Sequence, residues 1–471
     1  MSKGVGISFR FLGAITASLF ILAGAAQADQ APKKKLIEFG WDRPSPEFLR
    51  DNLAAIEKLP FDGIAVKLPM GEAIFTKTPY PIADYLAQQA ILSSIKFITL
   101  TDNFLLMWGT AEDGWLWTND ADWHAAETNI RNFADTAAAG GFKGVLWDAE
   151  TYGYNPWVYS ADRYPDQSFE AVQAVVFKRG VSFVTTLQSE LPDVQILALW
   201  LIGSILDERK WNDDPAAGSY ALYGAFISGM YSAIDSKARL IDGNESSYYY
   251  LGAKDFDAAG AYLKTGIEYL MPAAQAVAAE KFSLGQSVYA DGVLNLWKST
   301  RFIGYYLADD ADRMNLYKYN LYHGLRTTDE YLWLYNENMN WGLGDIPPGV
   351  EAATREVKAL IEAGKPLGFD MDTSLATARI EFDRKIEYWG RITDENDAPM
   401  AGASVISGIS DEDGGESGCG IYNINSFGCT VPFGWSGVFT PVLDGYRFEP
   451  DSIVITKAAK AQGLFFTAFK Q

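Results

Sequence analysis

The sequence is poor in the residues that most often carry metal or nucleophilic chemistry. Its 471 residues include only two histidines, His124 and His323, and two cysteines, Cys419 and Cys429. The histidines lie far apart in segments with a helical pattern, which argues against a histidine-type zinc site and against a Ser-His-Asp triad. The cysteines are close in sequence, and in an exported protein such a pair favours a local disulfide over a catalytic thiol. We therefore expect chemistry that uses no cofactor and no metal.

Positive charge is also scarce. Lys and Arg number 39 against 60 Asp and Glu, which gives a formal net charge of −21 at pH 7. An excess of negative charge argues against nucleic acid and against anionic membranes as partners. It favours a neutral or cationic small molecule instead.

Long hydrophobic runs are absent except near the N-terminus. Lys3 and Arg10 precede the apolar run FLGAITASLFILAGA, and AQA at 26–28 has the small-x-small pattern of a cleavage site. The run is short for a membrane span, and the polar DQAPKKK follows it. We predict a signal peptide over 1–28, and hence a secreted or periplasmic protein without stable membrane insertion. This segment holds two basic residues and no acid, so its removal changes the formal charge from −21 to −23.

Aromatic residues, in contrast, are abundant. The chain has 14 Trp, 25 Tyr and 27 Phe, together 14% of its residues. Flat apolar faces with polar edges suit stacking against sugar rings, although an aromatic-rich core uses the same residues. A carbohydrate ligand is therefore one hypothesis that the rest of the sequence has to support.

From residue 36, short apolar β-rich runs alternate with longer helical patterns. Strands are expected at 36–41, 61–68, 96–101, 144–150, 194–203, 238–245, 282–289 and 330–337, each followed by a helix. Eight strand–helix units in about 330 residues indicate an α/β fold, the (β/α)8 or TIM barrel, over 29–367. An open doubly wound sheet is disfavoured because GWDRPSP, after the first strand, is not a glycine-rich phosphate loop.

After residue 367 the helical periodicity stops. Short alternating segments bounded by Gly, Asp, Pro and Asn predict a linker and a small all-β domain over 368–471. EYWGRITDENDAPMAGASVISGISDEDG resembles the opening of carboxypeptidase-regulatory-like and related immunoglobulin-like modules, and GWSGVFTPVLDGYRFEPDSIVI resembles their later strands. The resemblance implies a β-sandwich and indicates little about function.

The carboxyl ends of the barrel strands are where a site is expected. Side chains alternate along a strand, so Asp148 and Glu150 share a face, as do Trp333, Tyr335 and Glu337. Acids are rarely buried without a partner or a role. We therefore expect Glu150 and Glu337 to be the principal catalytic acids, with Asp148 orienting a neighbour or holding a sugar hydroxyl.

Structural roles and rival acids stay open at this point. Glu150 could pair with Lys67 or Arg43, and Glu337 could brace a loop. Asp242 and Glu245, after the sixth strand, are rival catalytic acids. The residues expected to contact a substrate are Trp41, Asp42, Lys67, Asn103, Tyr152, Trp200, Asn244, Tyr289, Trp333, Tyr335 and Trp341, with Tyr154 and Trp157 in the loop after the fourth strand.

Carboxyl groups after strands four and eight, set in an aromatic mouth, resemble the (β/α)8 glycoside hydrolases in general. The resemblance implies cleavage of glycosidic bonds in an oligo- or polysaccharide by one protonated acid and one nucleophilic or basic carboxylate, with retention favoured. The large clan with this fold usually carries Asn-Glu after strand four and its nucleophile after strand seven. Here Ala149 precedes Glu150, and strand seven offers Ser287 and Tyr289, so the partner of Glu150 stays open.

Other classes fit parts of the same pattern. A carbohydrate-binding barrel without catalysis would keep the aromatic mouth and use the acids as hydroxyl ligands. A polysaccharide lyase for acidic sugars should show a basic cleft, whereas the strand ends are mostly acidic. A metal-dependent hydrolase would need a site made of Asp42, Asp148 and Glu150.

Overall fold

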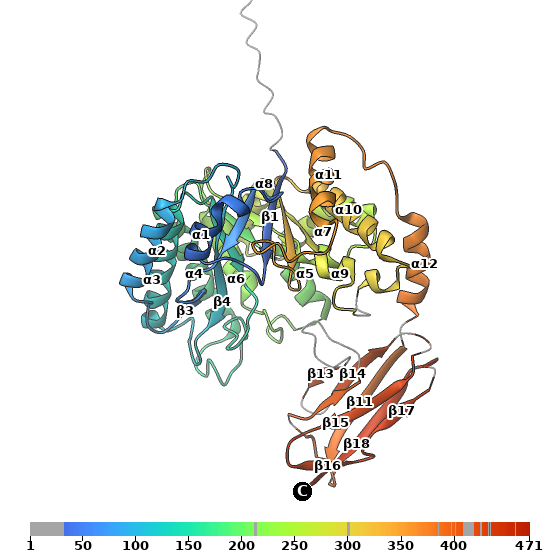
Figure 1. Ribbon diagram of the computed structural model, residues 1–471. Coiled ribbons are helices and arrows are strands. Elements are labelled where there is room, and N and C mark those ends of the chain that lie inside the picture. Colours follow the sequence, from blue (N-terminus) through green and yellow to red (C-terminus); the bar gives the residue numbers. More distant parts are fainter. Residues whose placement is uncertain are drawn as a thin grey trace, which may run out of the picture. The chain divides into compact units, whose positions relative to one another are not determined.

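The computed structural model describes residues 33–471 apart from 212–213, 299–301, 385, 397, 401, 408–418, 424–425, 432, 434 and 457. The predicted signal peptide lies outside the described residues. None of the helices within them is long and apolar enough to cross a membrane. The fold is mixed α/β, with a parallel barrel followed by separate C-terminal sheets (Figure 1).

The barrel strands pair in a single parallel ring. Their order is β8-β7-β6-β5-β4-β2-β1-β10-β9, and β3 (Ala73–Phe75) adds to the edge of β4. The strands are β1 (Lys35–Gly40), β2 (Gly63–Val66), β4 (Phe104–Ala111), β5 (Gly144–Asp148), β6 (Gln195–Ala198), β7 (Arg239–Asp242), β8 (Ser283–Leu284), β9 (Gln286–Tyr289) and β10 (Tyr331–Asn336).

One interrupted strand completes the ring. β8 and β9 follow each other directly on either side of Gly285; β8 pairs with β7 and β9 pairs with β10. Counting these halves as one strand gives eight positions, so the predicted (β/α)8 architecture is confirmed.

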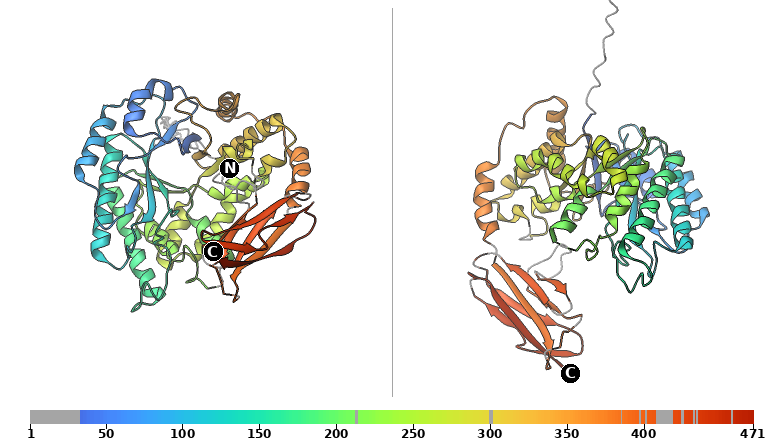
Figure 2. Two further views of the ribbon diagram at one scale, coloured as in Figure 1. Left: turned by 60° about the horizontal axis from the view of Figure 1, so that its bottom comes forward. Right: turned by 180° about the vertical axis from the view of Figure 1, so that it is seen from behind.

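Helices surround the strands, as both views of Figure 2 show. α1 begins at Pro46, because the Ser45 side chain accepts a hydrogen bond from the Phe48 amide and Pro46 occupies the first turn. The helices are α1 (Pro46–Ile56), α2 (Ile82–Ser94), α3 (Asp120–Ala139), α4 (Phe169–Glu190), α5 (Ile202–Trp211), α6 (Tyr223–Ala233), α7 (Ala253–Thr265), α8 (Pro272–Lys281), α9 (Ala290–Leu294), α10 (Asp310–Thr327), α11 (Val350–Glu362) and α12 (Asp372–Asp383), with 3-10 turns η1 (Glu245–Tyr249), η2 (Gly266–Tyr269) and η3 (Ile303–Tyr306).

Alternation along β5 shows how the strands serve two cores. Val145 and Trp147 belong to the large apolar cluster between strands and helices, whereas Leu146 belongs to the smaller cluster inside the barrel. Successive strand residues point to opposite faces, so Asp148 is directed inward at the carboxyl end of β5.

The third barrel strand is not where the sequence pattern predicts it. Residues 96–101 form a loop whose Ile98 is 82% exposed. The Glu57 carboxylate accepts hydrogen bonds from the amides of Ile98 and Thr99, at 2.8 and 2.6 Å, and so holds this loop. The strand is instead β4, whose first four residues are completely buried, because a strand covered on both faces reads as an apolar run rather than as an alternation.

This shift moves Asp102 and Asn103 to the amino ends of the strands, away from the expected site. Asn103 is buried there, where its Oδ1 accepts from the Ile64 amide and its Nδ2 donates to the Leu100 carbonyl. Its predicted role as a substrate contact is therefore wrong.

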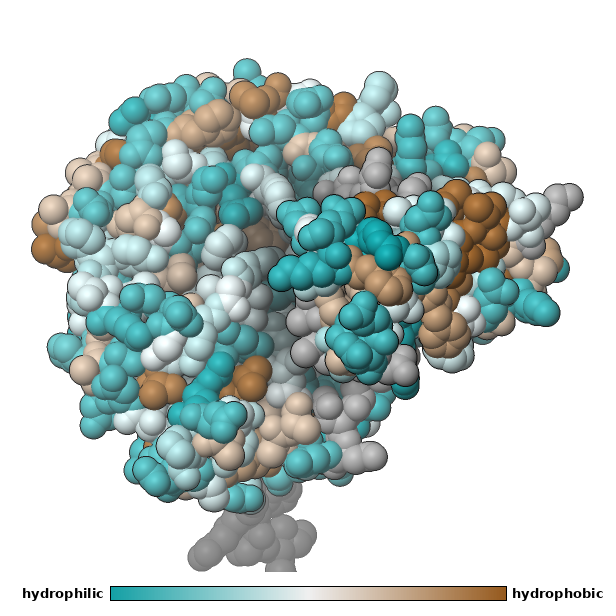
Figure 3. Space-filling view, turned by 90° about the horizontal axis from the view of Figure 1, so that it is seen from below, coloured by the Kyte–Doolittle hydropathy of each residue, from teal (hydrophilic) through white to brown (hydrophobic). Residues whose placement is uncertain are grey.

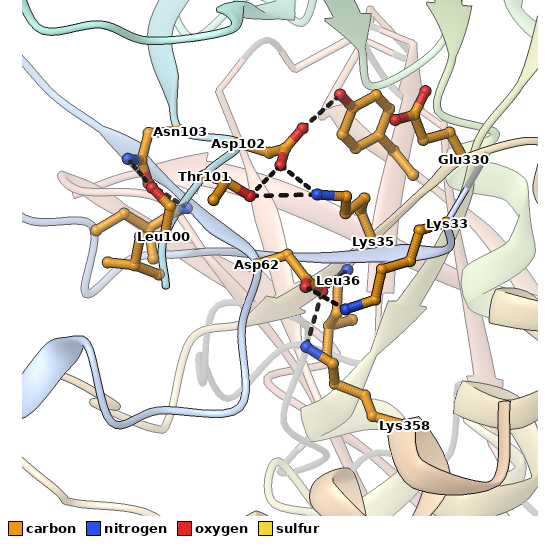
Figure 4. A network of polar contacts seen from close by, with 12 residues as sticks. Lys33, Lys35, Leu36, Asp62, Leu100, Thr101, Asp102, Asn103, Glu330 and Lys358 are labelled. Atoms are coloured by element: carbon orange, nitrogen blue, oxygen red, sulfur yellow. Dashed lines mark hydrogen bonds and ion pairs between the residues drawn. The ribbon is translucent and has the colours of Figure 1, made fainter. Parts of the chain in front are cut away.

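Lysines neutralise the carboxylates at this amino end (Figure 4). Asp102 accepts hydrogen bonds from Lys35 Nζ at 2.6 Å and from the Tyr331 hydroxyl at 2.8 Å. Asp62 accepts from Lys358 Nζ at 2.7 Å. Burial by itself would raise the pKa of Asp102, but the hydrogen bonds from Lys35, Thr101 and Tyr331 outweigh it, and the pKa is lowered.

The C-terminal region contains two sheets, ordered β13-β14-β11-β18-β16 and β12-β15-β17. One apolar cluster includes residues of both sheets, for example Tyr388 and Phe439, whose rings are 5.2 Å apart. Cys419 and Cys429 form a disulfide between the paired strands β13 and β14. The strands are β11 (Ile386–Asp394), β12 (Ser404–Ile406), β13 (Cys419–Asn423), β14 (Ser426–Val431), β15 (Gly437–Val442), β16 (Tyr446–Glu449), β17 (Ile453–Ile455) and β18 (Gln462–Lys470).

Candidate functional site

A cavity of about 770 Å³ lies at the carboxyl ends of the barrel strands, within the range typical of ligand sites. Figure 3 looks onto this end of the barrel from below and shows a hollow in the surface. The predicted site residues that the cavity brings together are Trp41, Lys67, Asp148, Glu150, Tyr152, Glu245, Tyr289, Tyr335 and Glu337. The lining residues that were not among the predicted catalytic or substrate-contacting residues are Phe39, Arg43, Trp108, Leu199, Tyr248 and Tyr249.

Two of the acids approach the cavity from opposite sides of the ring. Between β5 and β10 lie three strand positions in either direction, namely β6, β7 and β8/β9 one way and β4, β2 and β1 the other. Glu150 follows β5 and Glu337 follows β10, and both line the cavity. Their carboxyl groups therefore flank whatever occupies it.

Asp148 and Glu150 form an acid pair on the β5 side. Asp148 is 2% exposed, and its Oδ1 accepts a hydrogen bond from the Glu150 amide at 2.8 Å. Burial, together with the charge of Glu150, raises the pKa of Asp148 to about 8, so Asp148 is mainly protonated at pH 7. The carboxylate of Glu150 accepts from the Tyr152 hydroxyl at 2.6 Å, and the ring of Tyr152 lies 5.4 Å from that of Trp108.

Glu337 receives hydrogen bonds from two tyrosines, each linked to a tryptophan. The Tyr289 hydroxyl donates to Glu337 Oε1 at 3.1 Å and accepts from Trp297 Nε1 at 2.6 Å. The Tyr335 hydroxyl also hydrogen-bonds Glu337 and accepts from Trp41 Nε1 at 2.8 Å. The two sides of the cavity therefore differ: on the β5 side a protonated Asp148 lies beside Glu150, and on the β10 side two tyrosine hydroxyls donate to Glu337.

A buried acid that the sequence analysis missed positions the Glu337 backbone. Asp291 accepts hydrogen bonds from the amides of Glu337, at 2.5 Å, and Asn338, at 3.1 Å. Burial raises the pKa of Asp291 to about 6. Asp291 follows Tyr289 by two residues, just past the seventh strand, and this position could have marked it as a site residue. It holds the Glu337 amide as Asp148 holds the Glu150 amide.

Several aromatic residues expected to contact the substrate are core residues instead. Trp157 is completely buried, and its indole donates to the Ala149 carbonyl. Trp333 fills the barrel interior and donates to the Gly243 carbonyl. Trp341 is 2% exposed and packs edge-on against Phe61. None of them lines the cavity, because their large apolar surfaces are used between strands and helices or inside the barrel.

Asp42 also lies outside the cavity. Its Oδ2 accepts from the Trp341 amide at 2.7 Å, and it lies beside the buried Glu38. Burial raises the pKa of both acids. Asp42 therefore does not share a cavity with Asp148 and Glu150. Within the described part of the chain no three His, Cys, Asp or Glu residues are grouped so that they could hold a metal ion.

The acid at the end of β7 has a structural function. Asp242 is completely buried and accepts hydrogen bonds from the amides of Ile202, Gly203 and Asn244, so it fixes the start of α5. Asn244 donates from Nδ2 to Gln286 Oε1 at 2.7 Å. Asp242 and Asn244, with Trp200, line a neighbouring cavity of about 250 Å³ rather than the larger one.

Arg43, one of the two cationic residues that line the larger cavity, already has partners. Arg43 lies 3.8 Å from the Glu72 carboxylate, and its guanidinium lies over the ring of Trp108 at 5.2 Å. Burial raises the pKa of Glu72, while the charges of Arg43 and Lys67 oppose that shift. Glu150 instead accepts its side-chain hydrogen bond from the Tyr152 hydroxyl, at 2.6 Å.

Comparisons with known proteins give only distant structural likenesses. No family model and no curated protein matches the chain. The chain is similar to an O-GlcNAc hydrolase of Thermobaculum terrenum (TM-score 0.37, 9% identity, 74% of this chain and 62% of that chain), of which it spans less than two thirds. It is similar to a glycoside hydrolase 5 lichenase of Caldicellulosiruptor sp. F32 (TM-score 0.35, 8% identity, 66% and 84%). It is also similar to a putative sugar phosphate isomerase/epimerase of Anabaena variabilis (TM-score 0.36, 11% identity, 73% and 99%).

Proposed function

We propose that this protein is an exported glycoside hydrolase that cleaves an oligo- or polysaccharide with two groups of carboxyl side chains. The observation that carries the proposal is the aromatic-lined cavity into which β5 delivers Asp148 and Glu150 and the opposite strand β10 delivers Glu337. Carboxyl groups on both sides of one sugar-sized cavity are what acid–base cleavage of a glycosidic bond requires.

The two sides take different roles because their surroundings differ. At neutral pH Asp148 holds the proton of the Asp148–Glu150 pair, and Glu150, the more exposed member, takes up this proton and delivers it to the departing glycosidic oxygen. Glu337, held by Tyr289 and Tyr335, attacks the anomeric carbon as nucleophile. A water molecule then displaces Glu337 from the anomeric carbon. The hydroxyl group of this water stays on the anomeric carbon, and its proton returns to the Asp148–Glu150 pair. This sequence retains the anomeric configuration.

Rings at the entrance supply the binding surface. Trp41 and Tyr152 are each 60% exposed although both line the cavity. Large exposed rings beside a polar cavity suit stacking against the apolar face of a sugar. Lys67, at the same wall, offers a donor for sugar hydroxyls.

The test is hydrolysis of a panel of plant and microbial polysaccharides by the wild-type protein and four variants. Glu150→Gln and Glu337→Gln should each lower turnover by about a thousandfold or more, because each loses one acid–base or nucleophilic group. Glu280→Gln, an exposed glutamate on α8, is the matched control and should keep full activity. Turnover at the wild-type rate in both site variants contradicts the assignment, and full loss in Glu245→Gln alone moves the role to Glu245, which lines the same cavity.

A stereochemical measurement tests the nucleophile. NMR of the first anomer released should show retention if Glu337 attacks directly. Inversion would instead make Glu337 the base that activates water. Tight binding of a polysaccharide without any hydrolysis would favour a carbohydrate-binding barrel.

A further inference from the structure

The smaller cavity shares part of its wall with the proposed active site. Glu150, Glu245 and Tyr249 line both the 770 Å³ cavity and the 250 Å³ cavity. Asp148 and Glu337 line only the larger one, and Trp200 only the smaller one. Glu150 therefore stands at the boundary between two chambers rather than at the closed end of one.

The smaller cavity has the lining of a sugar subsite. Trp200 forms one wall, and the ring of Tyr220 meets it edge-on at 4.6 Å and fixes its orientation. Tyr249 forms another wall; it is 48% exposed and stacks on Phe302 at 5.7 Å. Flat rings together with a few polar groups are the usual composition of a site that orients a polar ligand.

The indole of Trp200 also carries an unused donor. Its Nε1 is buried and has no hydrogen-bond partner among the described residues. A buried polar atom of this kind normally has a partner in water or ligand.

The two cavities differ in volume and in the aromatic residues that line them. At about 250 Å³ the smaller cavity is below the usual range for drug-sized ligands, so it fits one ring-sized unit, whereas the larger cavity fits more. Trp41 lines only the larger cavity. Aromatic surfaces are thus available in both chambers, on either side of Glu150.

We infer that a carbohydrate chain binds across both cavities, with sugar units on each side of Glu150, so that the protein cleaves internal bonds, and that Trp200 is the binding platform of the smaller cavity. This inference rests on the proposed function, since it places the scissile bond beside Glu150. A protein that removes single terminal sugars needs a pocket that is closed beyond the acid, whereas here a second cavity shares the Glu150 wall.

The test uses hexasaccharides labelled at the reducing end, namely cellohexaose, xylohexaose, mannohexaose and chitohexaose. For the member that is cleaved, the first products of the wild-type protein should be di- to tetrasaccharides. Trp200→Ala should lower kcat/KM on the hexasaccharide about tenfold and shift the cleavage position, because stacking in the smaller cavity is lost. Tyr262→Ala, an exposed ring on α7 that lines neither cavity, is the control and should leave rate and products unchanged.

Binding to the Glu150→Gln variant gives a second readout that does not need turnover. Calorimetry with oligosaccharides of two to six units should show that affinity for the Glu150→Gln variant increases with the length of the ligand. When Trp200→Ala is added to this variant, the longest ligands should no longer bind more tightly than the shorter ones. Release of single sugars from the start, or an unchanged product pattern in Trp200→Ala, overturns this inference and leaves the proposed function intact. If no hexasaccharide is either cleaved or bound, the proposed function and this inference fail together.

Discussion

The two ends of the barrel use the same residue type under the same burial and give it opposite ionisation. Asp102, at the amino ends, is 3% exposed, and Asp148, at the carboxyl ends, is 2% exposed. Asp102 lies 2.6 Å from the Lys35 ammonium group and has a lowered pKa, whereas Asp148 lies beside Glu150 and has a pKa of about 8. Burial favours the neutral form of both aspartates; the hydrogen bonds from Lys35, Thr101 and Tyr331 reverse that effect at Asp102, whereas the charge of Glu150 adds to it at Asp148.

The largest effects are expected when the same substitution is made at both ends of the barrel. Asp102→Asn should lower the free energy of unfolding by about 3 kcal/mol at pH 7, because Lys35 loses its charged partner while both remain largely buried. Activity per folded molecule should not change. Urea denaturation measures the first quantity, and a loss of catalysis without a loss of stability would contradict the structural role of the amino end.

Asp148→Asn should raise the free energy of unfolding instead of lowering it, by an amount that depends on pH. The folded-state pKa of Asp148 is raised to about 8, above its unfolded value near 4. Between these two pH values Asp148 of the wild-type protein is protonated when folded and ionised when unfolded. The stability from this proton is complete below pH 4 and is lost as the pH rises to 8. We expect Asp148→Asn to gain a few kcal/mol relative to the wild type between pH 5 and pH 9. Parallel stability profiles for the two proteins would show that Asp148 is ionised when folded.

Two tyrosines allow a smaller matched test. Tyr289→Phe removes a donor to Glu337 and should lower kcat about tenfold with little change in KM, because a hydrogen bond to a charged group contributes about 1.5 kcal/mol or more. Tyr331→Phe removes a donor to Asp102 and should lower stability by a similar amount without changing kcat. Equal effects on kcat from both variants would contradict the division of roles between the two ends.

The smallest effect is expected at the surface of the amino end. Lys33 contacts Glu362 at 2.9 Å, but their side chains are 58% and 50% exposed. Exposed pairs of this kind contribute about 0.5 kcal/mol or less. Lys33→Gln should therefore change the urea midpoint only slightly, and a loss above about 1 kcal/mol would mean that Lys33 matters for Asp62, from which it lies 3.9 Å away.

The same comparison shows what the sequence can and cannot predict. The eight-unit barrel and the convergence of Glu150 and Glu337 followed from periodicity, since parity along a strand decides which side chains face inward. The third strand was misplaced because KFITLT has strand-like composition, while FLLMW, buried on both faces, does not alternate. That single shift moved Asp102 and Asn103 from one end of the barrel to the other.

The exposure of individual aromatic residues could not be predicted from the sequence either. Trp41 and Trp157 are the same residue type near strand ends, yet one is 60% exposed and the other is completely buried. Their roles depend on contacts with segments far away in sequence, such as Tyr335 for Trp41. The raised pKa of Asp148 likewise depends on burial by the folded chain, and composition does not determine it.

The pairing of β1 with β10 has a consequence for the order in which the barrel is made. Residues 35–40 pair with 331–336, so the first barrel strand has one exposed edge until nearly the whole barrel has left the ribosome. Contacts between such distant residues form slowly, and an unpaired edge invites association with other chains. During synthesis β1 can pair only with β2, and the ring closes when β10 arrives beside it. The last strand of the barrel therefore completes both the ring and, through Glu337, the active site in one event.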